Sequence, residues 1–129
     1  MTGSEDDKLR KALGPLGAEL LTVLWGADGP LSVRQVLEEV NRRRGEPLAY
    51  TTVMTVLNRL SERNVVRRAA RGRGFVYTAL VTGAADLAVR DVILDHGLSV
   101  VAHFVDRYQA EPQLRARLMN LIRPENEDS

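Results

Sequence analysis

The chain has 129 residues, 44% of them hydrophobic, and a formal net charge of +1 at pH 7. This length predicts one globular domain or a small domain with an appendage, and the total charge favours no class of partner. The sequence contains no cysteine, which excludes disulfides and thiolate metal sites. Its polar start and its lack of a long apolar run predict a cytoplasmic protein without membrane insertion.

The first predicted element is a helix that follows a charged N-terminus. Residues 1–12 carry many charges and are expected to be flexible. Pro15 then stands where the start of a helix tolerates proline, and the segment from Gly26 to Pro30 ends the helix. The side chains expected to face the core are Leu16, Leu20, Val23 and Leu24, with Trp25 at the helix end.

The second predicted helix has clear start signals. Ser32 is the predicted N-cap, and Gln35, three residues further on, completes a capping box. Leu31 and Val36 can pack against each other as a hydrophobic staple. The helix ends in Arg42, Arg43 and Arg44, whose charges complement the helix dipole or contact phosphates, and the sequence leaves both interpretations open.

The stretch "AYTTVMTVLNRL" predicts a third helix with an unusual polar face. Its apolar residues recur with helical spacing at Val53, Val56, Leu57 and Leu60. Threonine is a mediocre helix former, because its β-branch restricts χ1, yet three threonines lie on the other face. The helix is expected to run to about residue 63, and Asn64 is a plausible left-handed terminator.

A β-hairpin with a basic tip is predicted next. Val65 and Val66 precede the turn "RGRG", and the segment from Phe75 to Thr78 follows it. The order of three helices and a hairpin within about seventy residues is that of a winged helix-turn-helix. The fold class is therefore mainly α with a small β-hairpin, a winged helix-turn-helix followed by a helical dimerisation region.

In a winged helix the third helix enters the major groove of DNA and the hairpin contacts the backbone or the minor groove. Threonine can bond a phosphate or a base edge and can pack on a thymine methyl, whereas an ordinary solvated face would carry Glu, Lys or Gln. Arginines crowd between residues 42 and 73, where only Glu46 and Glu62 oppose them. The predicted DNA-binding residues are Tyr50, Thr51, Thr52, Thr55, Asn58, Arg59, Arg71 and Arg73.

Three further helices are expected between residues 83 and 123, and Ser99 and Pro112 are the predicted start signals of the last two. They carry more apolar residues than three short helices can bury, so a two-fold dimer interface is expected. The predicted dimerisation residues are Val101, Phe104, Val105, Leu114, Leu118 and Leu121. The domain boundaries are then 1–12 for the flexible N-terminus, 13–82 for the DNA-binding domain, 83–123 for the dimerisation region and 124–129 for a flexible tail.

Catalysis finds no support in the sequence. His96 and His103 come without a metal-ligand set, and no nucleophile motif, phosphate loop or paired acid constellation is present. No metal site, no cofactor and no enzymatic activity are therefore expected.

The segments "LGAELLTVLW", "SVRQVLEEV", "AYTTVMTVLNRLSERNVV" and "GRGFVYTALV" together resemble the penicillinase-repressor family of winged-helix regulators. The resemblance covers about residues 13–122. It implies a dimeric repressor on an inverted-repeat operator, often with TACA/TGTA half-sites. The family's DNA-reading positions fall on Thr51, Thr52, Thr55 and Arg59, with the wing contributing near Arg71 and Arg73.

The resemblance also implies a mode of derepression. In the antibiotic-responsive branch, a membrane sensor protease system triggers cleavage of the repressor at an Asn-Phe bond in the dimerisation part. The segment "AHFVDRY" is similar to that site and places the candidate bond at His103-Phe104. The cysteine cluster of the copper-responsive branch has no counterpart here.

Two alternatives remain at this point. One is a winged-helix regulator that a small ligand releases from DNA. The other is a winged-helix protein-interaction module without DNA binding, which would show no salt-dependent affinity for DNA.

Overall fold

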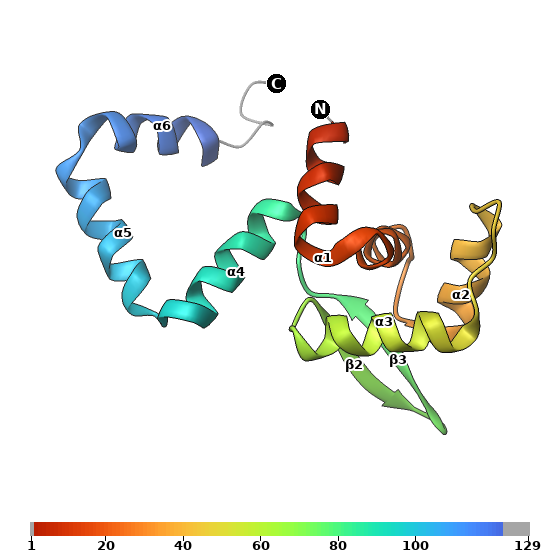
Figure 1. The fold of residues 1–129 in the computed structure, drawn as a ribbon. Helices are drawn as coiled ribbons and strands as arrows, with labels where there is room; N and C mark the ends of the chain where they lie inside the picture. The colour runs from red at the N-terminus through yellow and green to blue at the C-terminus, as the bar shows by residue number, and fades with distance from the viewer. Residues whose placement is uncertain (1, 123–129) are drawn as a thin grey trace. The chain divides into compact units, whose positions relative to one another are not determined.

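The computed structural model describes residues 2–122 and divides the chain into two compact units, residues 1–88 and 89–129. Side chains are described from residue 4 onward, and the tail predicted to be flexible, 124–129, lies outside the described residues. The elements of the first unit are α1 (Thr2–Trp25), β1 (Leu31–Ser32), α2 (Val33–Arg42), α3 (Tyr50–Glu62), β2 (Val66–Arg71) and β3 (Gly74–Ala79) (Figure 1). This is the order of a winged helix, as the sequence predicts.

α1 consists of two helical parts that meet at Gly14. This glycine has φ 82° and ψ 162°, a left-handed value that a residue with a side chain rarely adopts, and Pro15 follows it as the first helical residue of the second part. The predicted helix start is therefore correct, but a further helical part precedes it.

That preceding part differs from the flexible terminus expected for residues 1–12. It is helical, and the side chain of Leu9 is only 1% exposed in the main core. The Glu5 carboxylate also accepts a hydrogen bond from the backbone N–H of Ala84 at 2.6 Å. The many charges of residues 1–12 lead to the expectation of a flexible segment. The burial of Leu9 and the long-range hydrogen bond of Glu5 depend on tertiary contacts that composition does not show.

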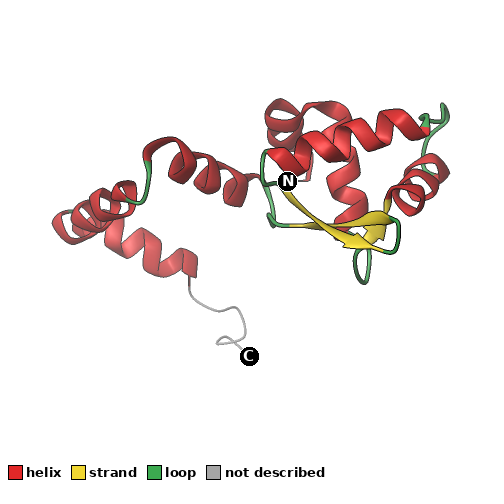
Figure 2. Cartoon of the chain, turned by 90° about the horizontal axis from the view of Figure 1, so that it is seen from below, coloured by secondary structure: helices red, strands yellow, loops and turns green. Residues whose placement is uncertain are grey.

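The capping box at the start of α2 is confirmed. The Ser32 hydroxyl accepts from the Gln35 N–H at 3.1 Å, and the Gln35 side chain accepts from the Ser32 N–H at 2.9 Å. Just before α2, residues Leu31–Ser32 form a strand that the sequence did not predict. This strand, β1, pairs antiparallel with β3, with Leu31 opposite Tyr77. The sheet therefore has three strands in the order β1-β3-β2, instead of a hairpin alone (Figure 2).

The core of this unit lies where α1, α2 and α3 pack together against the sheet (Figure 1). Asn64, with φ 66°, ends the segment after α3 in the left-handed conformation, as predicted. Trp25 does not close the core fully, because its side chain is 36% exposed, but its indole Nε1–H donates to the Val81 carbonyl at 2.8 Å. The fully buried apolar side chains include Leu20, Leu21, Val36, Val40, Val53, Leu57, Val65 and Val66.

The remaining helices are α4 (Ala84–His96), α5 (Ser99–Ala110) and α6 (Pro112–Ile122). Pro112 begins α6 as predicted. Ser99 is not the N-cap of α5: that position is Leu98, which makes no side-chain cap hydrogen bond and follows Gly97 at φ 79°. No residue of α5 or α6 is buried.

The capping box generates a stability prediction. Ser32→Ala removes the acceptor of the Gln35 N–H and should lower the free energy of unfolding by about 1 kcal/mol. Urea denaturation followed by circular dichroism measures the change. Ser32→Asp retains a capping acceptor and should restore most of the loss, whereas an Ala variant as stable as wild type would contradict the assignment.

The burial of Leu9 generates a second stability prediction. Leu9→Ala should lower the free energy of unfolding by about 2–5 kcal/mol, because it removes a side chain from the core. The matched control is Lys8→Ala, whose side chain is exposed and which should change stability by less than about 0.5 kcal/mol. Equal stabilities of the two variants would show that residues 4–12 are loosely attached.

Candidate nucleic-acid interface

α3 is held by the apolar stripe that its sequence predicts. Val53 and Leu57 are fully buried, Leu60 is 4% exposed, and Val56 is half-buried against the same core. The partners of α3 in this packing are α1, α2 and β2, and the rest of its surface is left for polar residues.

The predicted site residues on α3 differ in how accessible they are. Tyr50, Thr51, Thr55 and Arg59 are exposed, whereas Thr52 is half-buried. Thr51, Thr55 and Arg59 are spaced four residues apart and share one outward-facing side of α3, Tyr50 is exposed in the first turn, and Thr52 adds its accessible part. We call these five residues the recognition face.

Asn58 lies at the border of this face and has an internal partner. Its side chain is half-buried, and its Oδ1 accepts a hydrogen bond from the Tyr77 hydroxyl at 3.1 Å. Tyr77 itself is 1% exposed in β3. The Asn58 side chain thus links α3 to the sheet, a role that helical spacing alone did not indicate.

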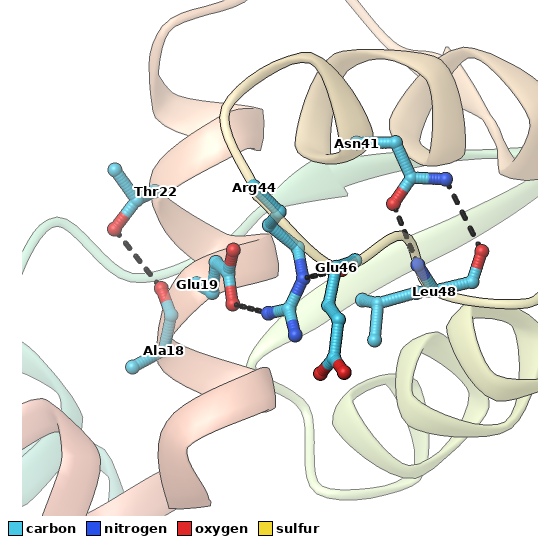
Figure 3. A network of polar contacts seen from close by, with 7 residues as sticks. All are labelled: Ala18, Glu19, Thr22, Asn41, Arg44, Glu46 and Leu48. Atoms are coloured by element: carbon cyan, nitrogen blue, oxygen red, sulfur yellow. Dashed lines mark hydrogen bonds and ion pairs between the residues drawn. The ribbon is translucent and has the colours of Figure 1, made fainter.

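The loop between α2 and α3 is fixed by hydrogen bonds of two side chains, Asn41 and Arg44, shown in Figure 3. The Asn41 side chain both donates to the Leu48 carbonyl at 3.1 Å and accepts from the Leu48 N–H at 2.8 Å. Arg44 donates to the Glu46 carbonyl and to the Glu19 carboxylate of α1, each at 2.7 Å. The turn between the two helices is therefore anchored to both α1 and α2.

The arginines at the end of α2 have carboxylate partners. Arg42 Nη1 lies 2.6 Å from Glu39 Oε1, and Arg43 Nη2 lies 3.2 Å from Glu39 Oε2. Together with the Arg44–Glu19 pair, these contacts balance part of the positive charge at this helix end. These ion pairs explain the three arginines structurally, without any phosphate. That the same arginines contact DNA phosphates stays a prediction.

The start of α3 lacks the side-chain cap that α2 possesses. Its N-cap is Ala49, which makes no side-chain hydrogen bond to the first turn. The backbone N–H groups at a helix start carry partial positive charge and can bind anions. Next to them, the Arg34 guanidinium lies over the Tyr50 ring, 5.6 Å from its centroid.

The wing consists of β2 and β3, joined at a tip where Gly72 has φ 61°. Arg71 and Arg73 are exposed at this tip, as predicted. A further arginine was missed: Arg68 of β2 lies over the Phe75 ring, 4.2 Å from its centroid. Sequence reasoning missed Arg34 and Arg68, because only the register of a folded pair shows which arginine meets which ring.

The predicted dimerisation residues occupy α5 and α6 of the second unit. Four of them are strongly exposed: Val101 44%, Phe104 50%, Val105 43% and Leu121 78%. Leu114 and Leu118 are half-buried, and α5 packs on α6. His103 and Phe104, the candidate cleavage bond, are both exposed within helical backbone.

Among residues 2–122 there is no group of three or more His, Asp or Glu side chains placed to hold a metal ion. In the same part of the chain, no helix combines the length and the apolar character that crossing a bilayer requires.

Comparison with known proteins places the chain in a family. The family model described as penicillinase repressor matches residues 13–124. The transcriptional regulator BlaI of Mycobacterium tuberculosis, from strains CDC 1551 / Oshkosh and ATCC 25618 / H37Rv, is 37% identical over 107 residues. These residues cover 77% of this chain and 75% of the relative.

A solved structure supports the fold. The ferric uptake regulator Fur of Helicobacter pylori superposes with a TM-score of 0.51 at 18% identity, over 61% of this chain and 57% of that one. The family match extends over the winged helix and over the helices that follow it, in agreement with the resemblance seen in the sequence. The chain belongs to the penicillinase repressor family, whose members are transcriptional repressors and not enzymes.

Proposed function

We propose that this protein is a dimeric, sequence-specific DNA-binding repressor that acts on an inverted-repeat operator. One observation carries the proposal: the buried stripe of α3 leaves the recognition face exposed next to a wing that carries exposed arginines. Family membership supports the same function. A repressor works where its DNA is, so the proposal includes a cytoplasmic location.

The recognition face has the chemistry for reading base edges. The exposed threonines Thr51 and Thr55 offer short hydroxyls and methyl groups, which suit base edges and the thymine methyl. Arg59, two turns from the helix start, can bond guanine O6 and N7 with two donors. Thr52 and Asn58 contribute less directly, because both are half-buried and Asn58 accepts from Tyr77.

The surroundings of this face suit the DNA backbone. The uncapped start of α3 offers N–H groups to a phosphate, and Tyr50 can pack against the adjacent sugar. Arg71 and Arg73 at the wing tip can reach phosphates or a minor groove. Such contacts position a protein on DNA, whereas the base contacts of α3 specify the sequence.

Binding to the promoter region of its own gene tests the DNA-binding part of the proposal. Affinity should fall steeply with salt concentration, because each neutralised phosphate contributes about −0.9 to the logarithmic slope. Arg59→Ala should weaken operator binding by roughly 1–3 kcal/mol and relax base preference at one position of each half-site. Fluorescence anisotropy with operator and random duplexes measures both quantities.

The matched control for Arg59→Ala is Arg117→Ala, which removes the same charge from an exposed position on α6. It should leave base preference unchanged. If Arg59→Ala weakens operator and random DNA equally, Arg59 contacts a phosphate and not a base. If the wild-type protein shows no salt-dependent binding to any duplex, the chain is a protein-interaction module instead.

Dimerisation through the second unit is the other part of the proposal. No residue of α5 or α6 is buried, although Phe104 and Leu121 are large and apolar. A concentration of exposed apolar side chains of this kind marks an interface. Two joined winged helices hold two half-sites at once, which raises affinity through effective concentration without new contacts.

A point substitution tests this interface. Phe104→Glu places a charge among the apolar side chains of α5 and should make the protein monomeric, with operator affinity lower by roughly a hundredfold. Gln109→Glu adds the same charge at an exposed polar position of α5 and should remain dimeric. Sedimentation and anisotropy decide the matter. A dimeric Phe104→Glu protein with full affinity would contradict the interface.

Cleavage at His103-Phe104 would act on the same region. The bond lies inside α5, so a protease needs this helix to open locally before the backbone can enter an active site. Cutting there would separate Val101 from Phe104 and Val105 and remove α6 from the chain. Derepression by a membrane sensor protease system would thus leave the recognition face untouched while removing dimerisation.

A further inference from the structure

The wing contains an arginine whose surroundings differ from those at the end of α2. Arg42, Arg43 and Arg44 each form an ion pair with a carboxylate. Within the described residues, Arg68 forms no ion pair, and its neighbour is the Phe75 ring at 4.2 Å. An aromatic ring orients a guanidinium without neutralising it, so the positive charge of Arg68 remains available to an anion.

The register of the hairpin determines the face on which Arg68 lies. Arg68 pairs with Tyr77, and Ala70 pairs with Phe75. Directly paired residues of antiparallel strands project to the same side, and residues two apart along a strand do so as well. Arg68, Phe75 and Tyr77 therefore share one face of the wing.

This face is the one that meets the recognition helix. Tyr77 is buried there and its hydroxyl donates to Asn58 of α3 at 3.1 Å. Arg67 and Arg71, at odd spacing from Arg68, project to the opposite face of the strand. Arg68 is thus the arginine of β2 that shares the α3-facing side of the wing, while Arg71 and Arg73 flank its tip.

The exposure of Phe75 also needs a reason. Phe75 is 42% exposed, and among residues 66–79 it is the one large apolar side chain that is exposed. A ring stacked on the guanidinium of Arg68 restricts its rotamers, while the N–H donors at the edge of the plane stay free. Ordering the arginine before binding lowers the entropy lost when it bonds a ligand.

We infer that Arg68 is a DNA-phosphate ligand on the α3-facing side of the wing, and that Phe75 is its positioning residue. The inference rests on the proposed function, because the ligand is the sugar-phosphate backbone beside the groove that α3 would occupy. It differs from the contacts assigned to Arg71 and Arg73, because it places a wing arginine next to the recognition helix and explains an exposed phenylalanine.

The experiment uses the full-length protein and compares two arginines of the same strand. Arg68→Ala should weaken binding to operator and random duplexes alike by about tenfold, as the loss of a charge-assisted hydrogen bond implies, and should reduce the salt slope by about one. Arg67→Ala removes the same charge from the opposite face and should change affinity by less than about twofold. Equal effects of the two variants would overturn the inference, because they would reflect overall charge alone.

The role of Phe75 is tested by a double-mutant cycle. Phe75→Leu should weaken binding about threefold in the wild-type background, as the loss of an exposed cation–π contact implies, and should have no effect once Arg68 is alanine. Phe75→Trp keeps the ring face and should restore binding. If Phe75→Leu is equally harmful in both backgrounds, Phe75 only stabilises the hairpin, and the positioning role is wrong.

The wild-type titration separates the two levels of the proposal. A wild-type protein without affinity for any duplex overturns the proposed function and this inference together. A wild-type protein that binds operator with a steep salt slope, but whose Arg68→Ala variant binds as Arg67→Ala does, overturns this inference alone. Thermal unfolding of each variant, with unchanged midpoints expected, confirms that affinities compare folded proteins.

Discussion

The contact of Tyr77 with α3 is the interaction on which the geometry of the candidate interface depends. Tyr77 lies in the central strand of the sheet, between β1 and β2, and is 1% exposed. Its ring belongs to the same core as Val53 and Leu57 of α3, and its hydroxyl bonds Asn58. This side chain therefore joins the wing to α3 through both the core and a hydrogen bond, and these are the two elements that a duplex would meet together under the proposed function.

Much of this arrangement follows from local sequence signals. The capping box of Ser32 and Gln35, the apolar stripe of α3 and the left-handed Asn64 are short-range features, and each was predicted correctly. The misses are long-range: the helical part before Gly14 is held by Leu9 in the core, and β1 exists only because Leu31 meets Tyr77. Pairings between distant residues leave no periodic pattern. Arg68 and Phe75 lie in one hairpin, but they could be matched only once the register of its two strands was known.

The basic middle of the chain separates into two groups with different environments. Arg42 and Arg43 at the end of α2 are paired with Glu39 of the same helix, whereas Arg44 is paired with Glu19 of α1 and anchors the turn before α3. Those of the wing are exposed and extend beyond the core. A cluster of like charges in the sequence thus serves both the internal architecture and the outer surface, and only the positions of the carboxylates distinguish the two.

The strand order β1-β3-β2 leaves β2 at the edge of the sheet. An edge strand exposes unpaired backbone N–H and C=O groups, and it can recruit a strand from another molecule. β2 reads Val-Arg-Arg-Ala-Ala-Arg, so its charges also discourage such pairing. Substitution at this strand is therefore constrained independently of any contact with DNA: exchanging its arginines for apolar residues would expose a short β-prone edge and favour aggregation.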